Sequence, residues 1–340
     1  MSVRVGINGF GRVGRCAFRS AHESGAEIEW AGINDVADAE TMAYLLRHDT
    51  LYGPFPGDVR VDGDALVVDG VPVPLFAATT PGEIPWADVA AEVVLECTGR
   101  FRSRDEAAGH LAAGARKVII SAPGKNVDAT LVLGVNFDTY DPVAHSVVSN
   151  ASCTTNCLAP VARVLHEALG IHHGVMTTIH AYTGDQRLVD LPHKDLRRAR
   201  AAAANIVPTS TGAAKAIGLV IPELAGRLQG FAARVPVLTG SLVDLTVEVE
   251  HRTTVEEVNG LFAEAASSDE LAGILQYSDE PLVSSDVIGS RYSSVFDAGL
   301  TTVSGGTQVT VIAWYDNEWG YSTRLAELAL QVLVPVAQPA

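Results

Sequence analysis

The chain has 340 residues, of which 47% are hydrophobic, and its 24 basic and 40 acidic side chains give a formal net charge of −16. This length suits two domains with sizeable cores, and the excess of acidic side chains opposes attraction to nucleic acid or to anionic membranes. No apolar run approaches the roughly 20 residues needed to span a bilayer, and the four cysteines favour a reducing compartment, so we expect a cytoplasmic protein without nucleic-acid or membrane partners.

The N-terminal segment has the pattern of a dinucleotide site. A short apolar strand, 3–7, runs into Gly9-x-Gly11-x-x-Gly14 and then into a helical stretch, 15–24. In this order Gly9 permits a tight turn, Gly11 lets a pyrophosphate approach the backbone, and Gly14 allows the helix to pack closely on the strand. The phosphates would lie at the helix N-terminus, where backbone N–H groups bind anions.

A second predicted strand, 28–33, ends just before Asp35. This carboxylate can accept hydrogen bonds from ribose hydroxyls and would repel a 2′-phosphate, which favours NAD over NADP. Such glycine motifs also occur in methyltransferases and ordinary turns, but the complete order of strand, glycines, helix, strand and acid favours NAD binding. Further parallel strands are predicted at 93–95, 117–120 and 132–135, with turns 98–101 and 121–124 at the ligand-binding edge of the sheet.

A cysteine lies where a predicted helix begins. The stretch 149–157, Ser-Asn-Ala-Ser-Cys-Thr-Thr-Asn-Cys, follows a strand-like run at 146–149 and precedes apolar residues at helical spacing. Free N–H groups and the helix dipole stabilise a thiolate there, so we expect a lowered pKa for Cys153 and a nucleophilic role. A metal or redox pair with Cys157 is a weaker alternative, and Cys16 and Cys97 are interpreted as structural.

A histidine, His180, ends a predicted strand at 175–180, 27 residues after Cys153. A lone histidine is more often structural, but cysteine with a distant histidine is a recognised nucleophile and base pattern. The segment up to Pro208 holds five basic residues, which form either a solvated helix face or a phosphate site. These residues are Arg187, Lys194, Arg197, Arg198 and Arg200.

The remaining pattern indicates a second sheet. Segments 241–250 and 307–315 are rich in β-branched residues, as in long antiparallel strands, and 322–333 has the pattern of a helix. A further helix is predicted at 213–220, directly after Thr211-Gly212, where free N–H groups can bind an anion.

Several long motifs resemble the phosphorylating glyceraldehyde-3-phosphate dehydrogenases: 5–12, 149–157, 191–203 and 314–318. The resemblance covers nearly the whole chain. It implies oxidation of D-glyceraldehyde 3-phosphate with NAD and inorganic phosphate to 1,3-bisphosphoglycerate, through a thioester on Cys153 and with His180 as the base. It also implies a homotetramer, in which the segment around Leu191-Pro192 approaches a neighbour's cofactor.

The resemblance further implies the binding residues. Those for NAD are Gly9, Gly11, Arg12, Val13, Asp35, Thr98, Gly99, Ser121, Asn317 and Tyr321. Those for the terminal phosphate of the substrate are Thr183, Asp185 and Arg234. Those for the attacking phosphate are Ser152, Thr154, Arg198, Thr211 and Gly212. No metal site is expected.

From these patterns we predict an α/β Rossmann-type parallel-sheet domain followed by an α+β catalytic domain with a mostly antiparallel sheet. The first is the NAD-binding domain, over 1–151, with a C-terminal helix, 320–335, packed back onto it. The second, over 152–319, is the catalytic and tetramer-interface domain.

Three residues depart from the usual pattern of the family: Thr79, where an arginine commonly contacts the adenine, Gly124, and Gly184, where an asparagine is usual. Neutral drift in surface turns is one explanation. Altered access for thiol-directed inhibitors, in an inhibitor-tolerant paralogue, is another. Alternative functions are oxidation of erythrose 4-phosphate or non-phosphorylating aldehyde oxidation on the same fold, and a non-enzymatic RNA- or protein-binding role, against which the intact Cys153, His180 and Arg234 argue.

Overall fold

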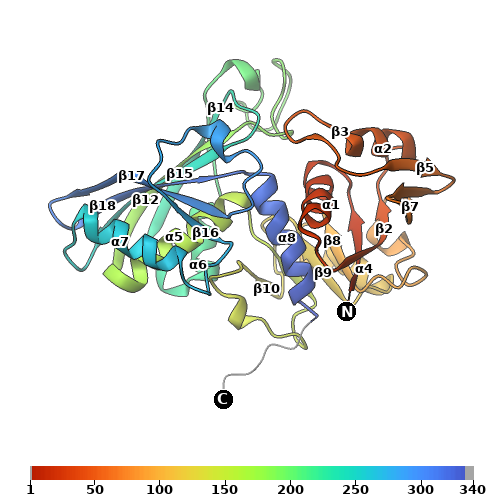
Figure 1. Cartoon of the computed structure of the whole chain (residues 1–340), viewed down its shortest axis with the longest axis horizontal. Coiled ribbons are helices and arrows are strands. Elements are labelled where there is room, and N and C mark those ends of the chain that lie inside the picture. The colour runs from red at the N-terminus through yellow and green to blue at the C-terminus, as the bar shows by residue number, and fades with distance from the viewer. Residues whose placement is uncertain (1, 334–340) are drawn as a thin grey trace. The chain divides into compact units, whose positions relative to one another are not determined.

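A computed structural model of the chain describes residues 2–333, in two compact units (Figure 1). Unit 1 comprises the described residues up to 131, then 137–151 and those from 322 on, whereas unit 2 comprises 132–136 and 152–321. The segment 132–136, which the sequence analysis included in the first domain, therefore groups with the second unit. None of the helices within the described residues is long and apolar enough to cross a membrane.

Unit 1 is built on a nine-stranded sheet with the order β10-β11-β9-β8-β1-β2-β7-β6-β5. The strands are β1 (Val3–Asn8), β2 (Ile28–Asn34), β5 (Val59–Asp62), β6 (Ala65–Val68), β7 (Val71–Phe76), β8 (Val93–Glu96), β9 (Lys117–Ile120), β10 (Ala129–Thr130) and β11 (Val147–Ser149). All neighbours from β10 to β7 are parallel, and only β6 pairs antiparallel, with β5 and β7. The predicted Rossmann-type sheet is confirmed.

The order of the strands indicates which edge of this sheet is suited to binding a ligand. The chain passes from β1 to β2 on one side and later returns to β8 on the other side of β1. The carboxyl ends of these three strands therefore meet at a topological switch point, where open parallel sheets bind ligands.

Helices and short strands complete unit 1. They are α1 (Arg12–Ser24), α2 (Ala39–Arg47), β3 (His48–Asp49), β4 (Gly53–Pro54), α3 (Arg104–Ala107), α4 (Gly109–Ala112) and α8 (Trp319–Gln331), with 3₁₀ turns at Pro81–Glu83 and Phe137–Thr139. From Ser322 on, α8 belongs to unit 1, where the Ser322 hydroxyl donates to the Val13 carbonyl at 3.4 Å. Of the predicted C-terminal helix 320–335, residues 334 and 335 lie outside the described residues.

The glycine turn between β1 and α1 needs two of its glycines for steric reasons. Gly9 has φ +96°, a left-handed conformation that side chains rarely adopt. A Cβ on Gly14 would clash with the carbonyl oxygen of Gly9 and approach the Ile7 side chain to 3.2 Å. Helix α1 can therefore start directly behind the turn and pack against β1.

The predicted strand at 132–135 is wrong. After β10 the chain forms a turn, in which the N–H groups of Val135 and Asn136 donate to the Val132 carbonyl at 3.0 and 3.2 Å. Gly134 adopts φ +76°, and the Asn136 side chain accepts the Val132 N–H at 2.8 Å. A run of four apolar residues does not distinguish a short strand from a buried turn.

Unit 2 contains a seven-stranded sheet with the order β13-β14-β12-β15-β18-β17-β16. The strands are β12 (Ile171–Ala181), β13 (Val207–Ser210), β14 (Leu228–Val235), β15 (Ser241–Val249), β16 (Leu275–Ser278), β17 (Ser294–Ser304) and β18 (Gln308–Tyr315). Only the pairs β12–β14 and β16–β17 are parallel, so the predicted mostly antiparallel sheet is confirmed. The helices are α5 (Cys153–Leu169), α6 (Ala213–Val220) and α7 (Val255–Ala266), and 3₁₀ turns lie at Ala202–Ala204, Pro222–Leu224 and Ser284–Val287.

A left-handed residue precedes helix α5. Strand β11 ends at Ser149, and Ala151, which is fully buried, has φ +54°. Ser152 then caps the helix, because its hydroxyl accepts the Thr155 N–H at 3.1 Å. The predicted helix start at Cys153 is confirmed.

We expect Gly14→Ala to destabilise the protein, because the new Cβ would clash with the backbone oxygen of Gly9, which cannot move without opening the turn. The free energy of unfolding in urea should fall by about 2 kcal/mol. Gly11→Ala is the matched control, since its Cβ would meet no atom within 4 Å. Equal stability of the two variants would contradict this account of the turn.

Candidate active site

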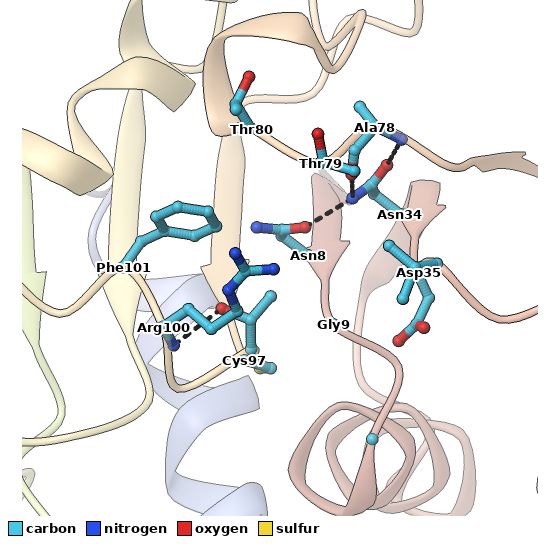
Figure 2. Close-up of a pocket in the computed structure, with 13 residues that line it drawn as sticks. Asn8, Gly9, Asn34, Asp35, Ala78, Thr79, Thr80, Cys97, Arg100 and Phe101 are labelled. Carbon is cyan, nitrogen blue, oxygen red and sulfur yellow. Dashed lines mark hydrogen bonds between the residues drawn. The ribbon is translucent and has the colours of Figure 1, made fainter.

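A cavity of about 240 Å³ lies in unit 1 at the carboxyl ends of β1, β2 and β8 (Figure 2). It is lined by Asn8, Gly9, Gly11, Asn34, Asp35, Val36, Ala78, Thr79, Thr80, Cys97, Thr98, Arg100 and Phe101. The predicted cofactor residues Gly9, Gly11, Asp35 and Thr98 are therefore brought together. The lining does not include Arg12, Val13, Gly99 or Ser121.

The Asp35 carboxylate is held in place by the backbone around the glycine turn. One oxygen accepts the N–H of Phe10 at 2.7 Å and the other the N–H of Ala37 at 2.9 Å. Each carboxylate oxygen has a second lone pair, so both remain able to accept a ribose hydroxyl. The carboxylate is thus oriented before any ligand arrives.

The start of α1 suits a pyrophosphate. Gly11 is the N-cap residue, no side chain caps the helix there, and the space at the position of a Gly11 Cβ is open to 4 Å. An anion can therefore approach the helix N-terminus. The side chain of Arg12 pairs with Asp49 and lies over the Tyr52 ring at 5.4 Å, which leaves the backbone of Arg12 as the part suited to a phosphate.

Other predicted cofactor residues lie at strand ends or in unit 2. Gly99, with φ +67°, lies in the turn after β8, and Ser121 directly follows β9. Asn317 belongs to unit 2, where its side-chain oxygen accepts the Ser241 hydroxyl at 2.7 Å, so its NH₂ group points the other way as a donor. Tyr321 also belongs to unit 2 and lies in the first turn of α8.

Unit 2 brings the predicted nucleophile and base together. Cys153 opens helix α5, His180 lies near the end of β12, and the distance from Sγ to Nε2 is 3.5 Å. Cys153 as a residue is half-buried, whereas His180 is buried. The other ring nitrogen, Nδ1, lies 2.7 Å from the Ala181 carbonyl oxygen, so a proton on Nδ1 leaves Nε2 free to accept the thiol proton.

The expected lowering of the Cys153 pKa is wrong for the free site. Burial raises the pKa of this thiol above its ordinary value, against the lowering effects of the Arg234 charge and of hydrogen bonds at Thr154. Burial, together with the same arginine, lowers the pKa of His180 to about 3. At neutral pH the pair is therefore a thiol beside an unprotonated imidazole, which is the form that a general base requires.

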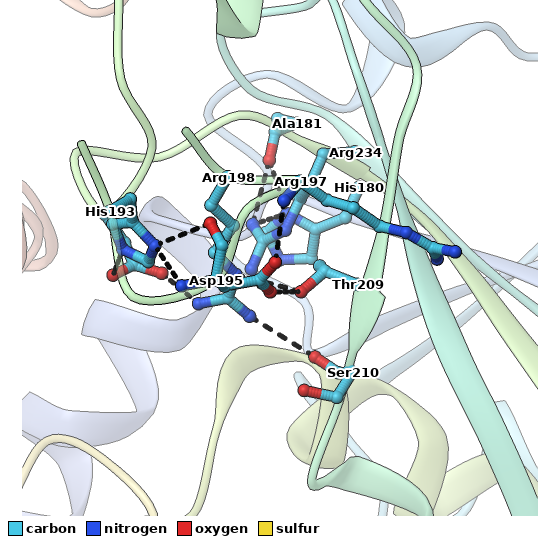
Figure 3. Close-up of polar contacts among 10 residues, drawn as sticks. His180, Ala181, His193, Asp195, Arg197, Arg198, Thr209, Ser210 and Arg234 are labelled. Atoms are coloured by element: carbon cyan, nitrogen blue, oxygen red, sulfur yellow. Dashed lines mark hydrogen bonds and ion pairs between the residues drawn. The ribbon is translucent and has the colours of Figure 1, made fainter. Parts of the chain in front are cut away.

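Arg234 lies behind the histidine. Its Nη1 is 2.7 Å from Nδ1 of His180 and donates to the Ala181 carbonyl at 3.0 Å (Figure 3). An arginine can only donate, so a hydrogen bond from Arg234 to Nδ1 would put the imidazole proton on Nε2. Donation from Nδ1–H to the Ala181 carbonyl instead leaves Nε2 unprotonated, and only this second tautomer can accept the thiol proton. The charge of the guanidinium also acts on the thiol of Cys153, whose pKa it lowers.

Arg198 is already engaged by acids and hydroxyls. It pairs with Asp185. Its Nε donates to the Thr209 hydroxyl at 2.9 Å and lies 3.5 Å from a carboxylate oxygen of Asp195 (Figure 3). The alternative of a solvated helix face for this basic segment is wrong, because the segment forms turns with only a 3₁₀ turn at 202–204. A phosphate at Arg198 would have to compete with the carboxylate of Asp185.

The other predicted phosphate residues lie at helix starts or in the same loop. Gly212 is the N-cap residue of α6 without a side-chain cap, next to Thr211, whose hydroxyl accepts the Ala213 N–H at 3.2 Å. The Thr154 hydroxyl shares a hydrogen bond with the buried Tyr315 phenol at 2.9 Å, so it supports the helix from inside. Thr183 accepts the Gln186 N–H at its carbonyl, 2.9 Å away.

The weaker alternative of a metal or redox pair gains no support from Cys157. This thiol is fully buried, burial raises its pKa to about 12, and Sγ donates to the Ala313 carbonyl at 3.7 Å. Among residues 2–333, no group of three or more His, Cys, Asp or Glu side chains is placed to hold a metal ion.

The three unusual residues differ in their surroundings. Thr79 is exposed and lines the unit 1 cavity, and Gly184 has open space around its Cβ position. A Cβ on Gly124 would lie 2.5 Å from a methyl carbon of Val127 and 3.1 Å from the Ser149 Cβ. Glycine at 124 therefore matches the local packing of this chain.

Sequence reasoning missed three residues around the unit 1 cavity. Asn8 and Asn34 line it, and Glu96 lies buried at the end of β8 with contacts to Asn8 and Thr98. The available signal was a polar residue at the carboxyl end of each apolar strand, where such sheets bind ligands.

Comparison with known proteins identifies both units. Residues 3–104 match the NAD binding domain of glyceraldehyde 3-phosphate dehydrogenase, and residues 152–317 match its C-terminal domain. A glyceraldehyde-3-phosphate dehydrogenase from Geobacillus stearothermophilus is 56% identical over 98% of both chains. Glyceraldehyde-3-phosphate dehydrogenase 2 of Streptomyces avermitilis is 53% identical over 98% of this chain and 99% of its own length, and glyceraldehyde-3-phosphate dehydrogenase 1 of Bacillus subtilis is 54% identical over 98% of both.

Arg234→Leu should slow alkylation of Cys153 by iodoacetamide at neutral pH. The positive charge of Arg234 lowers the pKa of Cys153, so its removal raises that pKa and reduces the thiolate fraction at every pH below it. We expect a roughly threefold to tenfold slower reaction at pH 7 and a rate profile displaced to higher pH. Arg200→Leu, which removes a charge paired with Asp190 at the surface, is the control, and superimposable profiles for all three proteins would refute the assignment.

Proposed function

Because this chain belongs to the glyceraldehyde-3-phosphate dehydrogenase family, we propose that Cys153 and His180 perform the reaction of that family here. The protein is an NAD-dependent oxidoreductase that converts D-glyceraldehyde 3-phosphate, with inorganic phosphate, to 1,3-bisphosphoglycerate. The observation that carries the residue assignment is the 3.5 Å separation of Sγ and Nε2 at the start of α5.

The chemistry starts with attack of Sγ of Cys153 on the aldehyde carbon. The thiol proton passes through Nε2 of His180 to the former carbonyl oxygen, which gives a hemithioacetal. NAD, when bound, would supply the acceptor for the hydride. His180 takes the hydroxyl proton as the hydride leaves, and a thioester remains on Cys153. We assign the N–H groups at the start of α5 to stabilising negative charge on the former carbonyl oxygen.

The second half-reaction releases the product. An oxygen of inorganic phosphate attacks the thioester carbon, the C–S bond breaks, and the acyl phosphate leaves while the electron pair stays on Cys153 as a thiolate. We assign the attacking phosphate to Ser152, Thr154, Arg198, Thr211 and Gly212. The terminal phosphate of the substrate is assigned to Thr183 and Arg234, with Asp185 beside them.

Within this assignment, Asp185 acts mainly as the counter-ion of Arg198. A carboxylate does not donate to a phosphate dianion, whereas it pairs directly with the guanidinium that we assign to phosphate binding. The pair keeps Arg198 oriented in the free enzyme and is exchanged for a phosphate oxygen in the complex.

The NAD site is assigned to the unit 1 cavity, with Gly9, Gly11, Asp35 and Thr98 in its lining and the backbone of Arg12 and Val13 at the helix start. Gly99 and Ser121 follow strands of the same edge. Asn317, with its outward NH₂ group, and Tyr321 are assigned to the nicotinamide. The fit rests on the uncapped start of α1 and the oriented Asp35 carboxylate.

We further propose a cytoplasmic homotetramer. The support is apolar surface on the sheet of unit 2, where Val175, Ile179 and Phe231 are 61%, 39% and 48% exposed. Light scattering after gel filtration should give the mass of four 35.7-kDa chains. A single species with the mass of one 35.7-kDa chain would refute the tetramer.

Turnover should depend on inorganic phosphate and select NAD. The absorbance of NADH measures its formation from glyceraldehyde 3-phosphate. Turnover is expected to cease without phosphate, because the thioester then cannot be released, and in Cys153→Ser, because the thioester then cannot form. NADP and erythrose 4-phosphate should support little turnover. Phosphate-independent turnover would favour the non-phosphorylating alternative, and complete inactivity would favour the binding role.

Asp185→Asn should lower the phosphate concentration that gives half the maximal rate. Removing the competing carboxylate from Arg198 is worth about 0.2–1 kcal/mol for an exposed ion pair, which corresponds to a decrease of roughly 1.4-fold to 5-fold in that phosphate concentration. Asp190→Asn, which breaks the pair with Arg200 in the same loop, serves as the control. An increased phosphate requirement would instead mean that the carboxylate holds Arg198 in its productive position.

Inhibitor tolerance remains a proposal, supported by the open space at Gly184. The rates at which epoxide or lactone electrophiles inactivate this enzyme, compared with those for a relative that has asparagine at this position, test it. Equal rates would remove the idea.

A further inference from the structure

A buried carboxylate that is not paired with a lysine or arginine of the described residues lies next to the lining of the NAD cavity. The Glu96 side chain is 1% exposed at the carboxyl end of β8. Its oxygen Oε2 accepts the NH₂ group of Asn8 at 2.6 Å and faces Nε2 of His110 at 3.0 Å. Its other oxygen, Oε1, accepts both the N–H of Thr98, at 2.9 Å, and the Thr98 hydroxyl. Four donors therefore converge on one carboxylate, with no lysine or arginine ion-paired to it within residues 2–333.

The protonation of this cluster follows from donors that cannot accept. The indole N–H of Trp86 donates to Nδ1 of His110 at 2.9 Å, so His110 carries its proton on Nε2, toward Glu96. The Thr98 hydroxyl accepts the Arg100 N–H at 3.1 Å, and its own proton goes to Glu96. A neutral imidazole and a hydroxyl leave the negative charge of Glu96 uncompensated, so hydrogen bonds alone stabilise it.

This charge determines how two amides of the cavity are oriented. Since Glu96 only accepts, Asn8 must turn its NH₂ group inward and its oxygen toward Asn34, whose NH₂ group donates to it at 2.8 Å (Figure 2). The Asn34 oxygen is then left to accept the Ala78 N–H at 2.8 Å. The lining of the cavity includes Ala78, Thr79 and Thr80. The orientation of hydrogen-bond donors and acceptors that Glu96 imposes on Asn8 and Asn34 therefore reaches this part of the lining.

We propose that Glu96 is a positioning residue of the NAD site. Its buried charge, held by His110 and Trp86, aligns Asn8, Asn34 and the Thr98 turn, and thereby pre-organises the cavity for the cofactor. Asn8, Asn34 and the Thr98 turn lie at the carboxyl ends of three neighbouring strands. Without Glu96, each of their amide or hydroxyl groups could adopt either of two orientations. The inference rests on the proposed binding of NAD in this cavity and deepens it.

Glu96→Gln is the decisive variant. Glutamine has one oxygen and one NH₂ group in place of two acceptors, so either orientation sets donor against donor, at Thr98 or at Asn8 and His110. We expect the dissociation constant for NAD, measured by isothermal titration calorimetry, to rise about tenfold, as for loss of a hydrogen bond to a charged group. The rate at saturating NAD and the number of thiols titrated by iodoacetamide per chain should stay within twofold of the parent.

Glu92→Gln is the matched control. It removes the same charge next to the opposite end of β8, where Glu92 pairs with Arg116 at 2.8 Å near the surface. Its dissociation constant for NAD should stay within twofold of the parent. A general effect of net charge would change both variants alike, and would overturn the proposal.

Trp86→Phe gives a second test if the first variant does not fold. It keeps an aromatic ring but frees Nδ1 of His110, so the proton can leave the Glu96 side. We expect roughly threefold weaker NAD binding, the size of one neutral hydrogen bond, with circular dichroism confirming the fold. Unchanged NAD binding in the folded variants overturns the role of Glu96, whereas a parent protein that does not bind NAD overturns the assigned cofactor site itself.

Discussion

The hydroxyl of Tyr315 ties the nucleophile to the base in unit 2. It shares hydrogen bonds of 2.9 Å with Thr154 in the first turn of α5 and with Thr178 on β12. The ring also meets His180 edge to face, with 5.9 Å between centroids. Burial raises the pKa of this phenol well above its ordinary value, so it keeps its proton. A helix start and a strand end are thereby held at one separation.

The charges at the proposed binding sites do not follow the overall acidic composition of the chain. An acidic protein has two arginines, Arg198 and Arg234, at the phosphate sites proposed above, and it pairs the first with Asp185. In unit 1 the reverse holds, because a carboxylate that is not paired with a lysine or arginine of residues 2–333 lies next to the lining of the cavity for a dinucleotide. In both units the charged group is oriented by hydrogen bonds before any ligand is present, which reduces the reorganisation that binding requires.

Much of this architecture could be predicted from local patterns. The glycine turn, the helix at Cys153, the strand that ends near His180 and the helix at 213–220 follow from periodicity and capping, which act over a few residues. The error at 132–135 arose because Gly134 and the Asn136 side chain turn an apolar run back on itself. These contacts span only four residues, so the glycine and the asparagine were a local turn signal that the apolar run concealed.

The site was harder to predict where burial decides. A helix start favours a thiolate, but the extent to which surrounding elements desolvate Cys153 is a property of the folded unit, and it reverses the direction of the pKa shift. Glu96 and Asn8 were overlooked for the same reason, since only the parallel sheet brings residues 88 positions apart into contact. The left-handed Ala151 also limits which sequences this fold can accept. Because the residue is fully buried and has φ +54°, a larger side chain would be both strained and crowded, so glycine is the replacement that this position tolerates best.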